Sequence, residues 1–171
     1  MKSILFAFLT LITLTACGQQ EDKSKRPSPP ALVKETIDGN INVSIDYSQP
    51  AVKGRTVGKD LEPMEGKVWR TGANEATVFE VDKNIKVEGK DLPAGKYGLF
   101  TIMNGDEWTI IFNKTWKQWG AFNYKEADDA LRVNVKGEKA KTFSERMTFS
   151  ISKNGKITLV WADKAVEFKI K

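Results

Sequence analysis

Hydrophobic and polar residues alternate along most of this chain, a pattern that predicts β-strands with one buried face. The clearest case is residues 41–47, where an apolar or aromatic side chain takes every second position and Pro50 follows as a stop. Runs of the same kind predict further strands in the first two thirds of the chain, at residues 76–81, 85–88, 96–103 and 107–113.

The last third of the chain continues this alternation and adds strong turn signals. Four more strands are predicted, at residues 131–136, 147–151, 156–162 and 166–170. Asn154-Gly155 is typical of a two-residue hairpin turn, and Asp163-Lys164 predicts a turn before the last strand. Only residues 124–131 favour a turn or two of helix. About nine strands without a long helix predict an all-β fold: a single antiparallel β-sandwich, with an open barrel as the alternative.

The first residues of the chain predict export from the cytoplasm. Lys2 precedes an apolar run over residues 4–14, which is too short for a helix that crosses a bilayer of about 30 Å. Residues 1–16 therefore predict a secretory signal peptide. Residues 14–17 resemble the lipobox of bacterial lipoproteins, which implies that Cys17, the single cysteine, carries lipid. We expect an outer-membrane lipoprotein, held by its lipid anchor and facing either the periplasm or the cell surface.

The segment that follows Cys17 is polar and rich in proline at its end. It has no apolar side chain that would favour an ordered conformation, so residues 17–30 are expected to be a lipidated cysteine followed by a flexible linker. Residues 31–171 then form one domain, large enough to bury a core without disulfides or metal.

Composition excludes several classes of function. The formal net charge is +5 and both signs are interspersed, which gives no reason to expect a nucleic-acid partner. The chain has no histidine, which removes Ser-His-Asp and Cys-His catalysis and histidine-based metal sites. Phosphate-binding glycine motifs and calcium loops are absent too. We therefore expect no metal and no cofactor, and we identify no catalytic residue.

Carboxylate chemistry is compatible with this composition, because glycoside hydrolysis needs only two acidic side chains. The acidic residues that stand near expected loops are Glu62, Glu65, Glu75, Asp128, Asp129 and Glu145. Sequence alone does not pair any two of them.

Residues 68–77 hold several side chains suited to binding. In one interpretation, Arg70, Asn74 and Glu75 surround a polar ligand and Trp69 forms a wall. In the other, Trp69 belongs to the core and an Arg70–Glu75 ion pair fixes a turn.

Aromatic residues gather in the long polar loop that precedes residue 125. They are Trp116, Trp119, Phe122 and Tyr124. Flat aromatic faces beside polar groups are one way to hold sugars. The alternative is that the two tryptophans cap the open end of a sandwich.

Several motifs, in one order, resemble a known family. They lie at residues 47–50, 53–55, 69–77, 92–101, 108–113, 119–120 and 129–132. Together they are similar to domain of unknown function 2911, a family of bacterial secreted proteins and lipoproteins, over roughly residues 31–155. The resemblance implies an all-β envelope protein of Gram-negative type, and it implies no activity.

The leading functional hypothesis is a non-enzymatic module that binds a glycan or another small polar ligand of the cell envelope. The alternatives are a carboxylate-dependent hydrolase and a structural or assembly partner of envelope proteins. The candidate ligand-binding residues are Arg55, Trp69, Arg70, Asn74, Glu75, Trp116, Trp119 and Tyr124.

Overall fold

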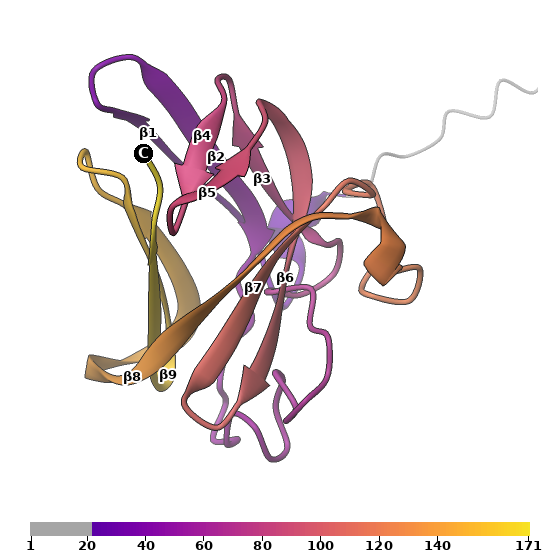
Figure 1. Ribbon diagram of the computed structural model, residues 1–171. Helices are drawn as coiled ribbons and strands as arrows, with labels where there is room; N and C mark the ends of the chain where they lie inside the picture. The colour runs from indigo at the N-terminus through magenta and orange to yellow at the C-terminus, as the bar shows by residue number, and fades with distance from the viewer. Residues whose placement is uncertain (1–21) are drawn as a thin grey trace, which may run out of the picture.

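The computed structural model describes residues 22–171, so the predictions for the signal peptide and Cys17 lie outside the described residues. The described chain is almost entirely β-structure (Figure 1). Its strands are β1 (Pro30–Ile37), β2 (Ile41–Ser48), β3 (Thr77–Val81), β4 (Ile85–Val87), β5 (Lys90–Leu92), β6 (Gly95–Asn104), β7 (Glu107–Asn113), β8 (Asp129–Ile151) and β9 (Lys156–Lys169). Its two 3-10 helices are η1 (Lys23–Lys25) and η2 (Glu126–Asp128). No helix in this part of the chain has the length and hydrophobicity needed to cross a membrane.

Seven strands form one curled antiparallel sheet in the order β1-β2-β3-β6-β7-β8-β9, and β4 and β5 form a separate two-stranded ribbon. The prediction of an all-β antiparallel fold is confirmed. The curled sheet fits either a sandwich or a half-barrel, because its two ends approach each other instead of spreading into an open plane (Figure 1).

Two sets of hydrogen bonds hold the curled sheet closed. On one side, the Phe149 backbone N–H donates to the Tyr47 hydroxyl at 3.1 Å, and the two rings meet edge to face. On the other side, the backbone groups of Lys86 and Lys171 exchange two hydrogen bonds of 2.8 and 2.9 Å, which attach the end of the chain to β4. The far ends of β8 and β9 therefore enclose the same interior as β1–β3.

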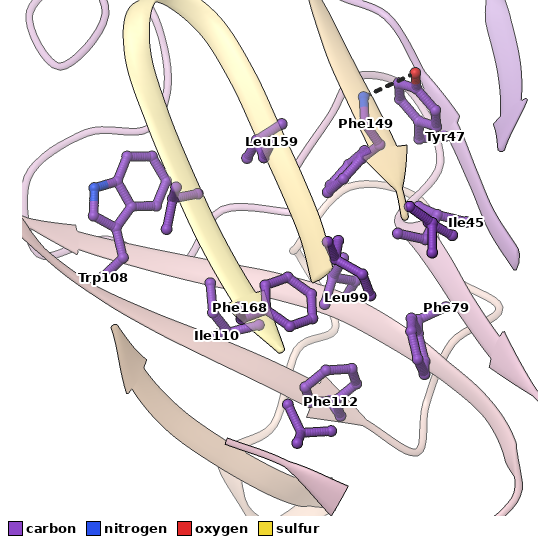
Figure 2. Packing of buried hydrophobic residues seen from close by; sticks show 14 of the residues in the cluster. Ile45, Tyr47, Phe79, Leu99, Trp108, Ile110, Phe112, Phe149, Leu159 and Phe168 are labelled. Carbon is purple, nitrogen blue, oxygen red and sulfur yellow. Dashed lines mark hydrogen bonds between the residues drawn. The ribbon is translucent and has the colours of Figure 1, made fainter. Parts of the chain in front are cut away.

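The interior is a single large hydrophobic core, part of which Figure 2 shows. Alternate residues of β2 and β3, such as Ile45 and Phe79, point into it and are completely buried. Phe112 of β7 packs edge to face against Phe79 at 5.0 Å and against Phe168 of β9 at 6.1 Å. The alternation in the sequence thus reflects the inward face of each strand.

Most expected strands are present, but their ends differ. The strands expected at residues 131–136 and 147–151 are parts of one long strand, β8, and the last two are parts of β9. Pairing between β8 and β9 shifts between Lys139 and Ser144, and Ala162 opposite has a φ of 53°. The turn expected at Asp163-Lys164 is therefore a bend inside a continuous strand, with a β-bulge beside it.

Three further features differ from expectation. β1 and β5 were not predicted. The helix expected within residues 124–131 is only the short 3-10 turn η2, flanked by extended residues. β1 also begins at Pro30, within the segment expected to be linker.

Candidate functional site

Residues 114–125, the aromatic loop from here on, lie on the outer face of the sheet. A Cβ atom added to Gly98 of β6 would stand 3.3 Å from the Thr115 carbonyl oxygen, so the loop rests directly on that strand. Ala121 and Tyr124 of the loop pack against a small second cluster built around Phe100 and Ile111. The loop is thereby seated on the sheet by its own apolar residues.

Residues 22–29, the N-terminal segment, also contact the body of the protein, although a flexible linker was expected there. The Pro29 carbonyl accepts from the Gln49 backbone N–H at 2.9 Å. The Ser28 carbonyl accepts from the Asn74 side-chain amide at 3.0 Å. These contacts are polar, so they leave no hydrophobic signal in the sequence.

Glu75 joins the N-terminal segment to the rest of the domain. Its two carboxylate oxygens accept from Lys23 Nζ and from Arg26 Nη1, each at 2.8 Å. Burial alone would raise the pKa of Glu75, but the hydrogen bonds from Lys23 and Arg26 outweigh it, and the pKa lies below its ordinary value. Glu75 therefore pairs with the N-terminal segment, and the Arg70–Glu75 ion pair proposed for the turn is not the interaction it makes.

Trp119 stands at the junction of the aromatic loop and the N-terminal segment. Its backbone forms a β-bridge with Glu75, and the Arg26 guanidinium lies over its indole ring at 5.7 Å from the centroid. This distance is within the range of a cation–π contact. The neighbouring Trp116 has the ammonium group of Lys96 over its ring at 5.6 Å.

Tyr124, at the end of the aromatic loop, is fixed by a polar network. Its hydroxyl donates to Asp129 Oδ2 at 2.7 Å and accepts from Arg132 Nη2 at 2.6 Å. Burial, together with the hydrogen bond to Asp129, raises the pKa of Tyr124 to about 12. The Asn113 side chain donates to the other oxygen of Asp129 at 2.7 Å, so this network secures the base of the loop.

The surroundings of the three other candidate residues indicate structural roles rather than ligand binding. Trp69 is only 2% exposed, stacks on Trp161 at 5.3 Å, and belongs to the core rather than to the wall of a site. The Arg55 guanidinium donates to the Ala51 and Val52 carbonyls of its own turn. Arg70 is partly buried; burial lowers its pKa, and its Nε has no hydrogen-bond partner. The structure therefore brings Asn74, Glu75 and Trp119 together and places Trp69 and Arg55 elsewhere.

A small pocket of about 90 Å³ lies beside Glu75 and is also lined by Asp46 and Lys23. Burial raises the pKa of Asp46 with a further contribution from Glu75, whereas Lys23 opposes the shift. Two carboxyl groups with pKa values moved apart are typical of acid–base pairs. The pocket is nevertheless far below the roughly 300 Å³ at which sites for small molecules begin. It does not hold a sugar ring.

A larger hollow of about 440 Å³ lies on the outer face of β8 and β9, and we call it the β8–β9 groove. Phe143 lines it from the bulge of β8 and is 59% exposed. Hydroxyl groups form much of the remaining lining, from Thr142, Ser144, Thr148, Ser150 and Thr158. This groove was not predicted from the sequence. The available sequence signal was the pair of outward-facing hydroxyl residues, Thr148 and Ser150, in the strand expected at 147–151.

Charge within the β8–β9 groove is balanced. Glu138 and Glu167 stand with Lys139 and Lys141 among its lining residues. Glu167 accepts from Lys156 at 3.1 Å and from the Thr158 hydroxyl at 3.0 Å. The groove therefore favours a neutral, hydroxyl-rich ligand over a strongly charged one.

Another hollow, of about 550 Å³, lies on β1, β2 and β3 and contains no aromatic side chain. Its Asn42 and Asp82 bond to each other through two hydrogen bonds of 2.9 and 2.6 Å. Within residues 22–171, no group of three or more acidic side chains is arranged to hold a metal ion.

Comparison with known proteins identifies a family but no characterised relative. The family model described as "Protein of unknown function (DUF2911)" matches residues 28–170. No curated protein and no solved structure matches the chain.

Proposed function

We propose that this chain, which belongs to the DUF2911 family, is a lipid-anchored protein of the cell envelope that binds a glycan or another small polar ligand without changing it chemically. The observation that carries the proposal is the β8–β9 groove, where an exposed aromatic ring stands among hydroxyl side chains. This is a different site from the aromatic loop that the sequence indicated.

The groove has the size and chemistry for such a ligand. Its volume of about 440 Å³ lies within the usual range for small-molecule sites, about 300–1,000 Å³. The Ser144, Thr148 and Thr158 hydroxyls already donate within the protein, but each can still accept a hydrogen bond from a hydroxyl group of a sugar. The Phe143 ring offers an apolar face for the C–H groups of a sugar ring.

The position of the bulge supports a binding role. Bulges re-aim side chains and occur next to functional sites. Here the shift in pairing between Lys139 and Ser144 contains Phe143 and turns its ring to solvent, although a regular strand alternates its side chains between the two faces. An aromatic side chain held outward by backbone geometry is available for contact.

The sequence supports the proposed location. The apolar run of residues 4–14 and the lipobox-like residues 14–17 support a signal peptide and a lipid on Cys17. The protein is then an outer-membrane lipoprotein that faces the periplasm or the cell surface. Lipid on the single cysteine also explains why a secreted chain carries one unpaired thiol.

Binding is favoured over hydrolysis. The chain has no histidine, and of the two groove carboxylates, Glu138 and Glu167, the latter is engaged by Lys156 and Thr158. The two carboxyl groups with separated pKa values, Asp46 and Glu75, line the small pocket instead. Glu75 is also bound on both oxygens.

A thermal-shift screen tests the proposal. The soluble protein that begins after Cys17 is melted with peptidoglycan fragments, with plant and host oligosaccharides, and with small organic acids. A ligand present at about a hundred times its dissociation constant adds about 2.7 kcal/mol to the free energy of unfolding. This corresponds to several degrees in melting temperature. A reproducible shift with one class supports the proposal, and a flat screen contradicts it.

A further inference from the structure

We propose that the aromatic loop, together with the N-terminal segment, lies on the surface of the anionic phospholipid membrane that holds the lipid anchor. The inference rests on the anchor of the proposed function, but it does not depend on any ligand in the β8–β9 groove. It concerns a separate surface, built by residues 114–125 and 22–29.

Exposed aromatic side chains are concentrated in this loop. Among the described residues, the exposed large hydrophobic side chains are Leu32, Trp116, Trp119, Phe122 and Phe143. Three of these five belong to the aromatic loop, and Phe122 is 82% exposed. Tryptophan is enriched at the interface between a membrane and water, because its ring is apolar and its N–H is polar. A loop with this composition is suited to the headgroup region.

Basic residues outnumber acidic ones around these rings, although Glu126 and Asp128 follow the loop directly and Asp128 accepts from the Thr115 hydroxyl at 3.0 Å. The aromatic loop contains Lys114, Lys117 and Lys125 and no acidic residue. The N-terminal segment adds Lys23, Lys25 and Arg26. Its Asp22 lies 3.6 Å from Lys25, and the nearby Glu75 is paired with Lys23 and Arg26. Clustered basic residues are attracted to anionic lipid headgroups.

The lipid anchor holds this surface within reach of the bilayer. Five peptide units join Cys17 to Asp22, and a fully extended chain of that length spans at most about 18 Å. The segment that follows is fixed to the loop, because Arg26 lies over Trp119 and binds Glu75. In Figure 1 the described chain begins on the same side of the molecule as the aromatic loop.

The polar groups beside Trp119 do not favour a sugar there. Both oxygens of Glu75 accept hydrogen bonds from the N-terminal segment. The side-chain amide of Asn74 donates to the Ser28 carbonyl. One face of the Trp119 ring has the Arg26 guanidinium over it. The exposed residues of the loop include three aromatic rings and three lysines, side chains that match a lipid surface.

This placement orients the whole protein. The aromatic loop ends just before β8, and the β8–β9 groove begins near Glu138 on the same strand. At about 3.3 Å per residue, the part of β8 between Asp129 and Lys139 spans about 33 Å. The strand therefore carries the groove away from the aromatic loop, toward the opposite side of the molecule (Figure 1).

The test uses fluorescent labels on the lipidated protein. Cys17 is the single cysteine and is blocked by lipid, so Phe122→Cys and Phe143→Cys each give one labelling site, on a side chain that is exposed in the native protein. Each variant is labelled with a dye that reports polarity and placed in vesicles of phosphatidylglycerol and phosphatidylethanolamine. An unchanged melting temperature shows that both variants fold.

We expect the dye at position 122 to shift its emission to shorter wavelength and to be quenched by spin-labelled lipids, while the dye at position 143 stays in water. Vesicles of neutral phosphatidylcholine should weaken the effect at position 122. The proposal is overturned if both dyes stay in water, if both enter the lipid, or if position 122 responds to oligosaccharides or to a protein partner and not to vesicles. A chain purified from membranes without lipid on Cys17 also overturns it. A ligand screen without any thermal shift, by contrast, overturns only the proposal that the β8–β9 groove binds a ligand.

Discussion

The guanidinium carbon of Arg26 lies 5.7 Å from the centroid of the Trp119 ring, which places a residue from just behind the predicted anchor against the aromatic loop. The same arginine binds Glu75 at 2.8 Å. Two segments that are far apart in the sequence therefore form one surface, and its stability should depend on Glu75.

Glu75→Gln should release the N-terminal segment, because it removes both ion pairs while keeping the size of the side chain. We expect faster trypsin cleavage after Lys23 and Lys25 at neutral pH. The global free energy of unfolding should fall by less than about 1 kcal/mol, since these pairs are partly exposed. Glu80→Gln is the matched control: it removes an ion pair with Lys96. Equal cleavage in both variants would contradict this role of Glu75.

Acid should release the same segment. The pKa of Glu75 lies below its ordinary value, so its contribution is complete above that ordinary value and is lost as the pH falls through the lowered pKa. Amide hydrogen exchange, corrected for its intrinsic pH dependence, should show residues 24–29 losing protection between neutral pH and about pH 3. In Glu75→Gln this pH dependence should be lost at residues 26–29, whereas Ser24 keeps the part that comes from its hydrogen bond to Asp22, whose pKa is also lowered. Protection that is independent of pH in the native protein would contradict the assignment.

The two tryptophans singled out by the sequence should differ in their effect on stability. Trp69→Ala removes a buried ring stacked on Trp161 and should cost about 3–5 kcal/mol. Trp119→Ala removes a ring that is 52% exposed and should cost about 1 kcal/mol. Denaturant unfolding of both variants measures the difference. Equal losses would mean that Trp119 supports the core.

The end of the chain should be sensitive to the size of residue 155. Gly155 has a φ of 79°, and a Cβ atom there would collide with the Ile170 backbone carbonyl. Gly155→Ala should therefore lower the free energy of unfolding by more than about 2 kcal/mol. Gly39→Ala is the control, because Gly39 has a φ of 76° and open space around its Cβ position. It should cost about 1–2 kcal/mol from backbone strain alone. Equal losses would show that the contact with Ile170 is unimportant.

Alternation in the sequence predicted the strands that have one continuous apolar face, such as β2 and β7. β1 was not predicted, because Glu35 occupies an inward position of an edge strand that is only half-buried. β5 is too short for any period to show. The bend at Ala162 looked like a turn between strands, because sequence shows the break in pattern but not the pairing that continues through it.

The candidate site was predictable only in part. Asn74, Glu75 and Trp119 were identified as polar or aromatic residues near loops, and the fold brings them together. Their partners Lys23, Arg26 and Ser28 were assigned to a linker, because ion pairs between distant segments leave no periodic signature. Phe143 gave no signal, since its exposure comes from a bulge that only the pairing of β8 with β9 reveals.

The most direct test of the account is the melting temperature of the native protein, Phe143→Ala and Phe122→Ala with and without the oligosaccharide that gives the largest shift in the screen. Both side chains are exposed, so neither substitution alone should change stability by more than about 0.5 kcal/mol. We predict that the ligand stabilises the native protein and Phe122→Ala equally, and that most of the shift is lost in Phe143→Ala. An undiminished shift in Phe143→Ala, or a loss confined to Phe122→Ala, would contradict binding in the β8–β9 groove.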